Sequence, residues 1–302
     1  MPNWINAQKT SFQKQDQLFQ GVNINLFSDE QRLAYDIITT HSNKIKPKEP
    51  LLLIINGVAG TGKSYLINGV YNHLKDKCIV TATTGKASYN INGVTVHSLL
   101  RLPINSTTQK DLSGQALSRI QERLRGIDYL LIDEYSMLGQ TTMGWIDRRC
   151  KQATGMQEIL FGGISVILIG DPAQLPPVGD KPLYHSKPST ATGQQGYCAY
   201  QMFVHVVILS VNQRVIGSDH DQNLFRELLL RLRNGETTQD DWKHLLARQP
   251  SKVPNIDHFK DVIRLYYTNA EVAAYNYECL VKLNQPIAEI HAKHSSELTK
   301  KD

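Results

Sequence analysis

The chain has 302 residues, of which 41% are hydrophobic and 20% are charged, so it is long enough for one large domain or two smaller ones. This composition is that of a normal globular protein, so disorder is not the default expectation, and the net charge of +5 permits a nucleic-acid partner without establishing one. The four cysteines are far apart and form no CxxC pair, which indicates neither a zinc site nor a disulfide framework. No apolar run approaches the ~20 residues that cross a bilayer, and the first 20 residues lack the apolar core of a secretory signal. We therefore expect an intracellular protein that does not enter a membrane.

Short β-type runs alternate with helical segments through the first two thirds of the chain. Ser28 and Gln31 form a capping-box pattern that predicts a helix ahead of the first strand. Nearly continuous apolar strands separated by helices are typical of a parallel sheet that is covered on both faces. The expected strands are residues 51–55, 78–82, 129–133, 166–170 and 206–209. The predicted fold class is therefore α/β, a P-loop NTPase with a RecA-like parallel sheet flanked by helices.

The rest of the chain predicts further elements and a domain division. A polar stretch from 103 and an expected helix at 115–124 indicate a small insertion near 103–125. A loop with Pro250 and Pro254 is a plausible boundary, because prolines interrupt regular structure. Helices are expected at 223–232, 239–246 and 269–283, and a fresh strand at 262–267. We predict a polar N-terminal extension (1–24), a RecA-like lobe (25–250) and the beginning of a second RecA-like lobe (260–302).

The segment LLLIINGVAGTGKS contains the pattern GxxxxGK[ST], between an expected strand and an expected helix. Glycines let backbone N–H groups wrap phosphates, and the following helix offers them its positive end. Lys63 is expected to reach the β- and γ-phosphates and Ser64 to hold Mg²⁺. An ordinary glycine-rich turn is a weak alternative, because the lysine and the serine are also correctly placed. The residues predicted to bind the nucleotide are Gly57, Ala59, Gly60, Thr61, Gly62, Lys63 and Ser64.

Polar residues at the ends of three expected strands complete a hydrolytic site. Asp133 is expected to hold Mg²⁺ and Glu134 to polarise the attacking water, although such a strand end by itself is as often merely solvated. Gln174 lies in a proline-rich loop and can sense the γ-phosphate or orient water; a simple turn is the alternative. Arg214 can stabilise charge on the γ-phosphate, as arginine fingers do, or be a plain surface arginine.

Taken together and in order, these segments resemble the superfamily 1B DNA helicases of the petite-integration-frequency (Pif-type) family. The resemblance covers roughly residues 25–285 and includes FSDEQRLAYDII, GVAGTGKS, TATTGKASYNINGVTVHSLLRLP, LLIDEYSM, FGGISVILIGDPAQLPPVGDKPLY and ILSVNQRV. It implies an ATP-dependent helicase that moves 5′ to 3′ on single-stranded DNA and unwinds duplex junctions. It also implies roles in DNA repair, recombination and telomere maintenance, in the nucleus or mitochondrion of a eukaryote.

The resemblance also assigns roles to individual residues. Gln31 matches the glutamine that reads adenine, so the nucleotide would be ATP, although Gln31 also fits the capping box. Short hydroxyls and a lysine at a strand end can bond phosphate oxygens without reading bases. The residues expected to grip the DNA backbone are Thr83, Thr84, Lys86, His97 and Ser98. For each of these residues taken separately, the alternative is a helix cap or, for His97, a satisfied core histidine. The insertion contains no aromatic residue, which leaves a strand-separating role open.

Two later segments of the family, of the Thr-x-His-Lys-x-x-Gly and Ser-Arg kinds, are not found before residue 302. The sequence therefore leaves a second reading open, in which the chain is a truncated ATP- and DNA-binding module that does not unwind DNA. A small-molecule kinase on the same P-loop is weak, because no segment supplies a lid for an acceptor substrate. Protein partners are not indicated.

Overall fold

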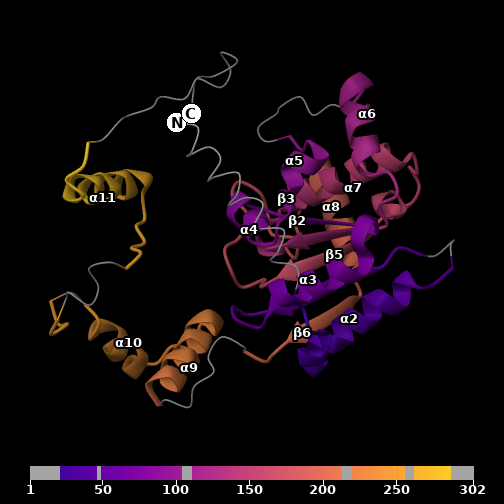
Figure 1. Cartoon of the computed structure of the whole chain (residues 1–302). Helices are drawn as coiled ribbons and strands as arrows, with labels where there is room; N and C mark the ends of the chain where they lie inside the picture. Colours follow the sequence, from indigo (N-terminus) through magenta and orange to yellow (C-terminus); the bar gives the residue numbers. More distant parts are fainter. Residues whose placement is uncertain are drawn as a thin grey trace. The chain divides into compact units, whose positions relative to one another are not determined.

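The computed structural model (Figure 1) describes residues 21–45, 49–103, 111–212, 220–249, 251–255 and 262–286. The chain divides into two compact units, Met1–Glu227 and Leu228–Asp302. The limits that we predicted for the N-terminal extension and the two lobes stay predictions.

The first unit is built on one parallel sheet of six strands, in the order β3-β2-β4-β5-β1-β6. The strands are β1 (Leu52–Gly57), β2 (Cys78–Ala82), β3 (Val94–Thr95), β4 (Tyr129–Asp133), β5 (Ser165–Gly170) and β6 (His205–Leu209). The predicted parallel sheet is confirmed, and β2 and β4 have the predicted bounds. The two-residue strand β3 is the one that sequence periodicity missed, because two residues show no alternation.

Helices cover both faces of this sheet (Figure 1). They are α2 (Asp29–Ser42), α3 (Lys63–Leu74), α4 (Gly85–Asn90), α5 (Val96–Leu100), α6 (Gly114–Arg123), α7 (Gln140–Thr154) and α8 (Ala191–Gln201). Short 3₁₀ turns lie at Ile24–Leu26, Lys75–Lys77, Tyr135–Met137 and Leu160–Gly163. The helices predicted at the start of the lobe and in the insertion correspond to α2 and α6. Residues 104–110 of the insertion lie outside the described residues.

Successive side chains of each strand enter two separate apolar clusters. In β4, Tyr129 and Leu131 pack with the residues of α2 and α3, whereas Leu130 and Ile132 pack with those of α5, α7 and α8. All four are fully buried. Burying one such side chain stabilises the fold by roughly 1.5–3 kcal/mol, which explains why the strands read as continuous apolar runs.

The second unit contains helices at the predicted places. Helix α9 (His220–Asn234) crosses the division, and α10 (Gln239–Leu246) and α11 (Asn269–Lys282) follow it. Arg231 in α9 bonds both carboxylate oxygens of Asp241 in α10, at 2.9 and 2.7 Å. Asp241 also closes a capping box with Thr238, so this carboxylate fixes the turn between the two helices.

The strand predicted at 262–267 is wrong. These residues form no strand, and Ile263, Leu265 and Tyr267 are at least 93% exposed. A strand is stabilised by hydrogen bonds to a neighbour, and within the described part of the chain this segment has no strand beside it. An apolar composition favours a strand but does not supply the neighbouring strand with which it must pair. Among the described helices, none is long and apolar enough to span a membrane.

Candidate nucleotide site and DNA-contact surface

The loop between β1 and α3 has the backbone that the GxxxxGK[ST] pattern predicts. Gly60 and Gly62 have φ of +90° and +77°, which side-chain-bearing residues rarely adopt. A Cβ on Gly57 would lie 2.4 Å from the Thr61 Oγ1 atom, so the loop folds back tightly on the end of β1. Helix α3 begins at Lys63, directly after this turn. Its first backbone N–H groups therefore face the loop, as phosphate binding requires.

The two polar side chains of the motif stand at the start of α3. The Lys63 Nζ atom donates to the carbonyl oxygens of Gly57 and Val58, at 2.7 and 3.1 Å. The ammonium group is thus held at the loop itself. The Ser64 side chain, in the first turn of the helix, is exposed. Both side chains lie where a phosphate seated in the loop would meet them.

Gln31 joins α2 to this loop. Its Oε1 atom accepts from the Ser28 backbone N–H at 3.0 Å, so the predicted capping box is confirmed. Its Nε2 atom donates to the carbonyl oxygens of Thr61 and Gly62, at 3.1 and 3.3 Å. The side chain is buried. Both ends of the amide therefore bond the protein in this structure, and adenine reading stays a prediction.

Asp133 and Glu134 lie at the carboxyl end of β4. The Asp133 carboxylate is buried and accepts from the Glu134 backbone N–H at 3.0 Å. Burial is the main reason that the pKa of Asp133 is raised to about 6, and the Glu134 charge acts in the same direction, while this hydrogen bond and Lys63 oppose the rise. A carboxylate that has lost its hydration gains most from a bound cation. Together with the Ser64 hydroxyl it provides the oxygen ligands that Mg²⁺ prefers.

The backbone around Glu134 is held in an unusual conformation. Glu134 has φ +54° and ψ +44°, the left-handed region. The next residue, Tyr135, is buried and its hydroxyl donates to the Asn56 Oδ1 atom of β1 at 2.6 Å. Sequence reasoning missed this bond. Two features of the sequence could have indicated this bond. Asn56 is a polar residue inside an otherwise apolar strand, and Tyr135 directly follows the paired carboxylates.

Of the two other predicted catalytic residues, Gln174 lies within the described part of the chain and Arg214 does not. Gln174 is exposed in a turn after β5, where its backbone N–H donates to the carbonyl of buried Asp171 at 3.0 Å. Two positions before Arg214, the Asn212 Nδ2 atom donates to the carbonyl of Ala59 in the loop, at 3.3 Å. Asn212, the last described residue before Arg214, therefore lies beside the loop.

Of the residues predicted to grip DNA, Thr83 and Thr84 lie between β2 and α4, Lys86 lies on α4, and His97 and Ser98 lie on α5. These segments follow the carboxyl ends of β2 and β3. Because all strands are parallel, these ends are at the same sheet edge as the nucleotide loop. Lys86 and Ser98 are exposed. Burial lowers the pKa of His97, so its imidazole is neutral at neutral pH.

Two features of this surface bear on the predicted contacts: a helix cap at Thr84, which the sequence left open as an alternative, and the ring of Tyr89, which was not predicted. Thr84 uses its hydroxyl to cap α4, accepting from the Ala87 backbone N–H at 3.2 Å. Tyr89 is half exposed, and the Lys86 Nζ atom lies 5.4 Å from its ring centre. An exposed aromatic ring beside a lysine suits a nucleobase as well as a phosphate. The spacing of three residues on one helix was the available signal.

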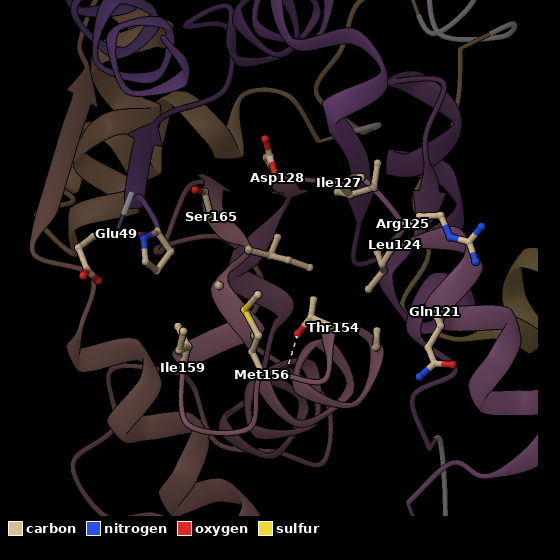
Figure 2. A pocket seen from close by; sticks show the side chains of 16 residues that line it. Glu49, Gln121, Leu124, Arg125, Ile127, Asp128, Thr154, Met156, Ile159 and Ser165 are labelled. Atoms are coloured by element: carbon tan, nitrogen blue, oxygen red, sulfur yellow. Dashed lines mark hydrogen bonds between the residues drawn. The ribbon is translucent and has the colours of Figure 1, made fainter. Parts of the chain in front are cut away.

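A cavity of about 1130 Å³ lies at the opposite edge of the sheet (Figure 2). Glu49, Asp128 and Ser165, which precede or begin strands, line it together with Leu124 and Met156. It contains no part of the glycine loop or of the carboxylate pair. The volume of this cavity therefore does not identify the nucleotide site, which is defined by its loop and its polar groups.

Residues 26–243 match the PIF1-like helicase family, and this match covers both the loop and the carboxylate pair. The chain belongs to the PIF1-like helicase family. The family is the one that the sequence segments resemble, so that prediction is confirmed.

Individual members of the family are similar over much of the chain. The ATP-dependent DNA helicase Pif1 of Bdellovibrio bacteriovorus is 33% identical over 224 residues, which are 70% of this chain and 44% of that protein. The chain thus spans less than half the length of this relative. A crystal structure of Bacteroides Pif1 with ADP-AlF3 and single-stranded DNA has a TM-score of 0.62 at 23% identity, over 87% of this chain and 58% of that one. Pif1 of Candida albicans gives 0.61 at 24% identity, over 87% and 56%. These structures share the fold.

Proposed function

We propose that the chain is the nucleotide-hydrolysing lobe of an ATP-dependent DNA helicase, which moves 5′ to 3′ along single-stranded DNA and opens duplex junctions. The observation that carries this proposal is the common edge of the sheet. The glycine loop, the Asp133–Glu134 pair and the helices α4 and α5 all follow the carboxyl ends of strands at this edge. The Bdellovibrio relative is named as an ATP-dependent DNA helicase, and Bacteroides Pif1 was crystallised with a nucleotide analogue and single-stranded DNA, which supports the same assignment.

Each polar group of the site has a task in phosphoryl transfer to water. Lys63 binds the β- and γ-phosphates, and Gln31 contacts the adenine. Ser64 and Asp133 hold Mg²⁺, which neutralises charge on the phosphates when bound. Glu134 takes a proton from the attacking water. Gln174 orients that water, and Arg214 stabilises the charge that develops on the γ-phosphate.

The DNA strand is proposed to cross the surface of α4 and α5. Lys86 contributes a positive charge to the backbone phosphates, and Thr84, His97 and Ser98 contribute neutral donors. Tyr89 adds a ring on which a base can stack. A protein with this activity would act in genome maintenance inside the cell, in the nucleus or mitochondrion if the source is a eukaryote.

Rates of ATP hydrolysis with and without a single-stranded oligonucleotide test the proposal, with Lys63→Ala and Glu134→Gln as comparison variants. We expect the oligonucleotide to stimulate the wild-type rate and both variants to lose at least about 99% of it, the usual effect of removing such a group. Glu134→Gln should still bind ATP, because the phosphate-binding loop is intact. A rate that does not respond to the oligonucleotide, or that survives in Glu134→Gln, would contradict the proposal. Binding of ATP without turnover would instead indicate a binding module.

Strand polarity requires a separate measurement on a forked or tailed duplex. We expect unwinding of a duplex with a 5′ single-stranded tail and none with a 3′ tail. The reverse preference would overturn the proposed direction of movement.

A further inference from the structure

Thr83 occupies a junction between the two halves of the proposed site. It follows β2 directly and opens the segment that leads into α4. The last residue pair of the β2–β4 ladder joins Ala82 and Asp133. Beyond that pair, the Thr83 backbone N–H donates to the Asp133 carbonyl at 3.3 Å, and the Thr83 Oγ1 atom donates to the Glu134 carbonyl at 3.1 Å. One residue thus bonds the backbones of both carboxylate residues.

The second of these bonds fixes a conformation that a glutamate does not adopt readily. Glu134 is in the left-handed region, which is disfavoured for any residue with a Cβ. Its N–H group is already bonded to the Asp133 side chain. The close pass of the next peptide against β5 also constrains it, since a Cβ on Gly170 would lie 3.0 Å from the Tyr135 nitrogen. On the other side, the Glu134 carbonyl accepts two bonds, from the Thr83 hydroxyl at 3.1 Å and from the Met137 backbone N–H at 3.3 Å. The bond from Thr83 is the one that ties this carbonyl to the segment leading into α4.

The same residue is tied to the proposed DNA surface. Thr84 is the N-cap of α4, and its hydroxyl accepts from the Ala87 backbone N–H. Any movement of α4 toward a bound strand therefore acts on Thr83 through a single peptide bond. Sequence resemblance assigned Thr83 to direct DNA contact, but its hydroxyl proton is directed to Glu134 instead.

We propose that Thr83 is a positioning residue, whose hydroxyl holds the Glu134 peptide in its left-handed conformation and thereby couples single-stranded DNA on α4 to the general base. This inference rests on the proposed function, because it needs Glu134 to act as the base. It assigns the hydroxyl to the coupling of the two sites, whereas Lys86 and its neighbours make the DNA contacts.

The test compares three variants of the whole chain. Thr83→Val removes the hydroxyl and keeps the shape, and Thr83→Ser restores the hydroxyl. Thr81→Val is the matched control, since the Thr81 hydroxyl bonds a carbonyl of the same neighbouring strand, that of Leu131 at 2.8 Å, two residues away. Steady-state kinetics with saturating oligonucleotide give kcat and KM for ATP, and fluorescence anisotropy gives the Kd for the oligonucleotide.

We expect Thr83→Val to lower the DNA-stimulated kcat about tenfold, with KM for ATP and Kd for DNA within about twofold of wild type. Thr83→Ser should recover most of kcat, and Thr81→Val should lower the unfolding temperature without this loss of kcat. An unchanged kcat in Thr83→Val overturns the inference. So does weaker DNA binding with normal kcat at saturating DNA, which is the result of a direct contact.

Amide hydrogen exchange of the peptide around 129–138 tests the bond without using activity. Loss of one hydrogen bond should speed exchange near Glu134 about fivefold in Thr83→Val and leave Thr83→Ser unchanged. Equal exchange in both variants and wild type overturns the inference even if the chain hydrolyses ATP. A wild-type rate that ignores DNA refutes the proposed function and the coupling, while the exchange result still decides whether Thr83 holds Glu134.

Discussion

At the residue scale, the proposed catalytic centre combines a buried carboxylate with a lysine that already bonds the loop. Asp133 has lost its hydration inside the carboxyl edge of the sheet, and the Lys63 ammonium is hydrogen-bonded to two loop carbonyls. A bound nucleotide with its cation would give both groups a better partner. The free protein is therefore expected to be less stable than the loaded one, because the Asp133 charge is poorly compensated.

Replacing Asp133 by Asn tests whether the buried charge lowers the stability of the nucleotide-free protein. The pKa of Asp133 is raised from 3.8 to about 6, so the folded state holds the proton more tightly than the unfolded state. The free energy of unfolding accordingly falls as the pH rises from about 4 to about 6, by at most about 3 kcal/mol. In nucleotide- and metal-free protein, Asp133→Asn should unfold at a higher temperature than wild type at pH 7.5. At pH 4 the advantage should vanish. A lower unfolding temperature at pH 7.5 would show that the carboxylate stabilises the fold.

Several residues of the site could be predicted from the sequence, but their hydrogen-bond partners could not. The glycine loop and the carboxylate pair follow from local patterns, because strand, turn and helix are adjacent in the chain. The bonds of Thr83 to Glu134 and of Tyr135 to Asn56 join residues 51 and 79 positions apart. No local pattern encodes such pairs, because they arise from the strand order. Gln31 was ambiguous for the same reason, since its contact with the loop depends on how α2 packs against α3.

At the element scale, periodic segments with a partner in the fold were predictable. The strands of the parallel sheet other than β3, and the helices α10 and α11, lie where hydrophobic patterns and caps indicated. The segment 262–267 has the composition of a strand but no strand beside it, within the residues that the structure describes. Composition reports what a segment can form, and pairing decides what it does form.

The contact of α7 with α8 yields a prediction at this scale. A Cβ on Gly196 would lie 1.9 Å from the Gln140 carbonyl oxygen and 2.6 Å from the Gly144 nitrogen, so the two helix backbones touch. Gly196→Ala should force them apart and lower the free energy of unfolding by about 1–3 kcal/mol. Gly193→Ala in the same helix is the control, because its Cβ meets only side chains, at 3.0 Å and beyond. Urea unfolding measures both, and equal stabilities would contradict the close approach.

At the scale of the whole molecule, the parallel sheet separates the protein into two edges with different chemistry. The carboxyl edge gathers the loop, the carboxylates and the helices α4 and α5. The amino edge carries the cavity of Figure 2. The sequence predicted the loop and the carboxylates at strand ends, and strand ends of a parallel sheet meet at one edge; the helices α4 and α5 were not predicted. It did not predict the cavity, which is formed by residues from three separate segments, 49–50, 121–128 and 153–165.

The small net charge of +5 makes DNA binding a local rather than a global electrostatic matter. Lys86 is charged and exposed, whereas His97 is neutral because burial lowers its pKa. Lys86→Gln should therefore reduce the slope of log K against log salt for single-stranded DNA by about 0.7, the value for one phosphate contact. His97→Gln can weaken binding but should leave the slope unchanged. Oligonucleotide titrations at four salt concentrations and pH 7.5 measure both slopes. An altered slope for His97→Gln would mean that the bound strand protonates this imidazole, and an unaltered slope for Lys86→Gln would remove Lys86 from the phosphate contacts.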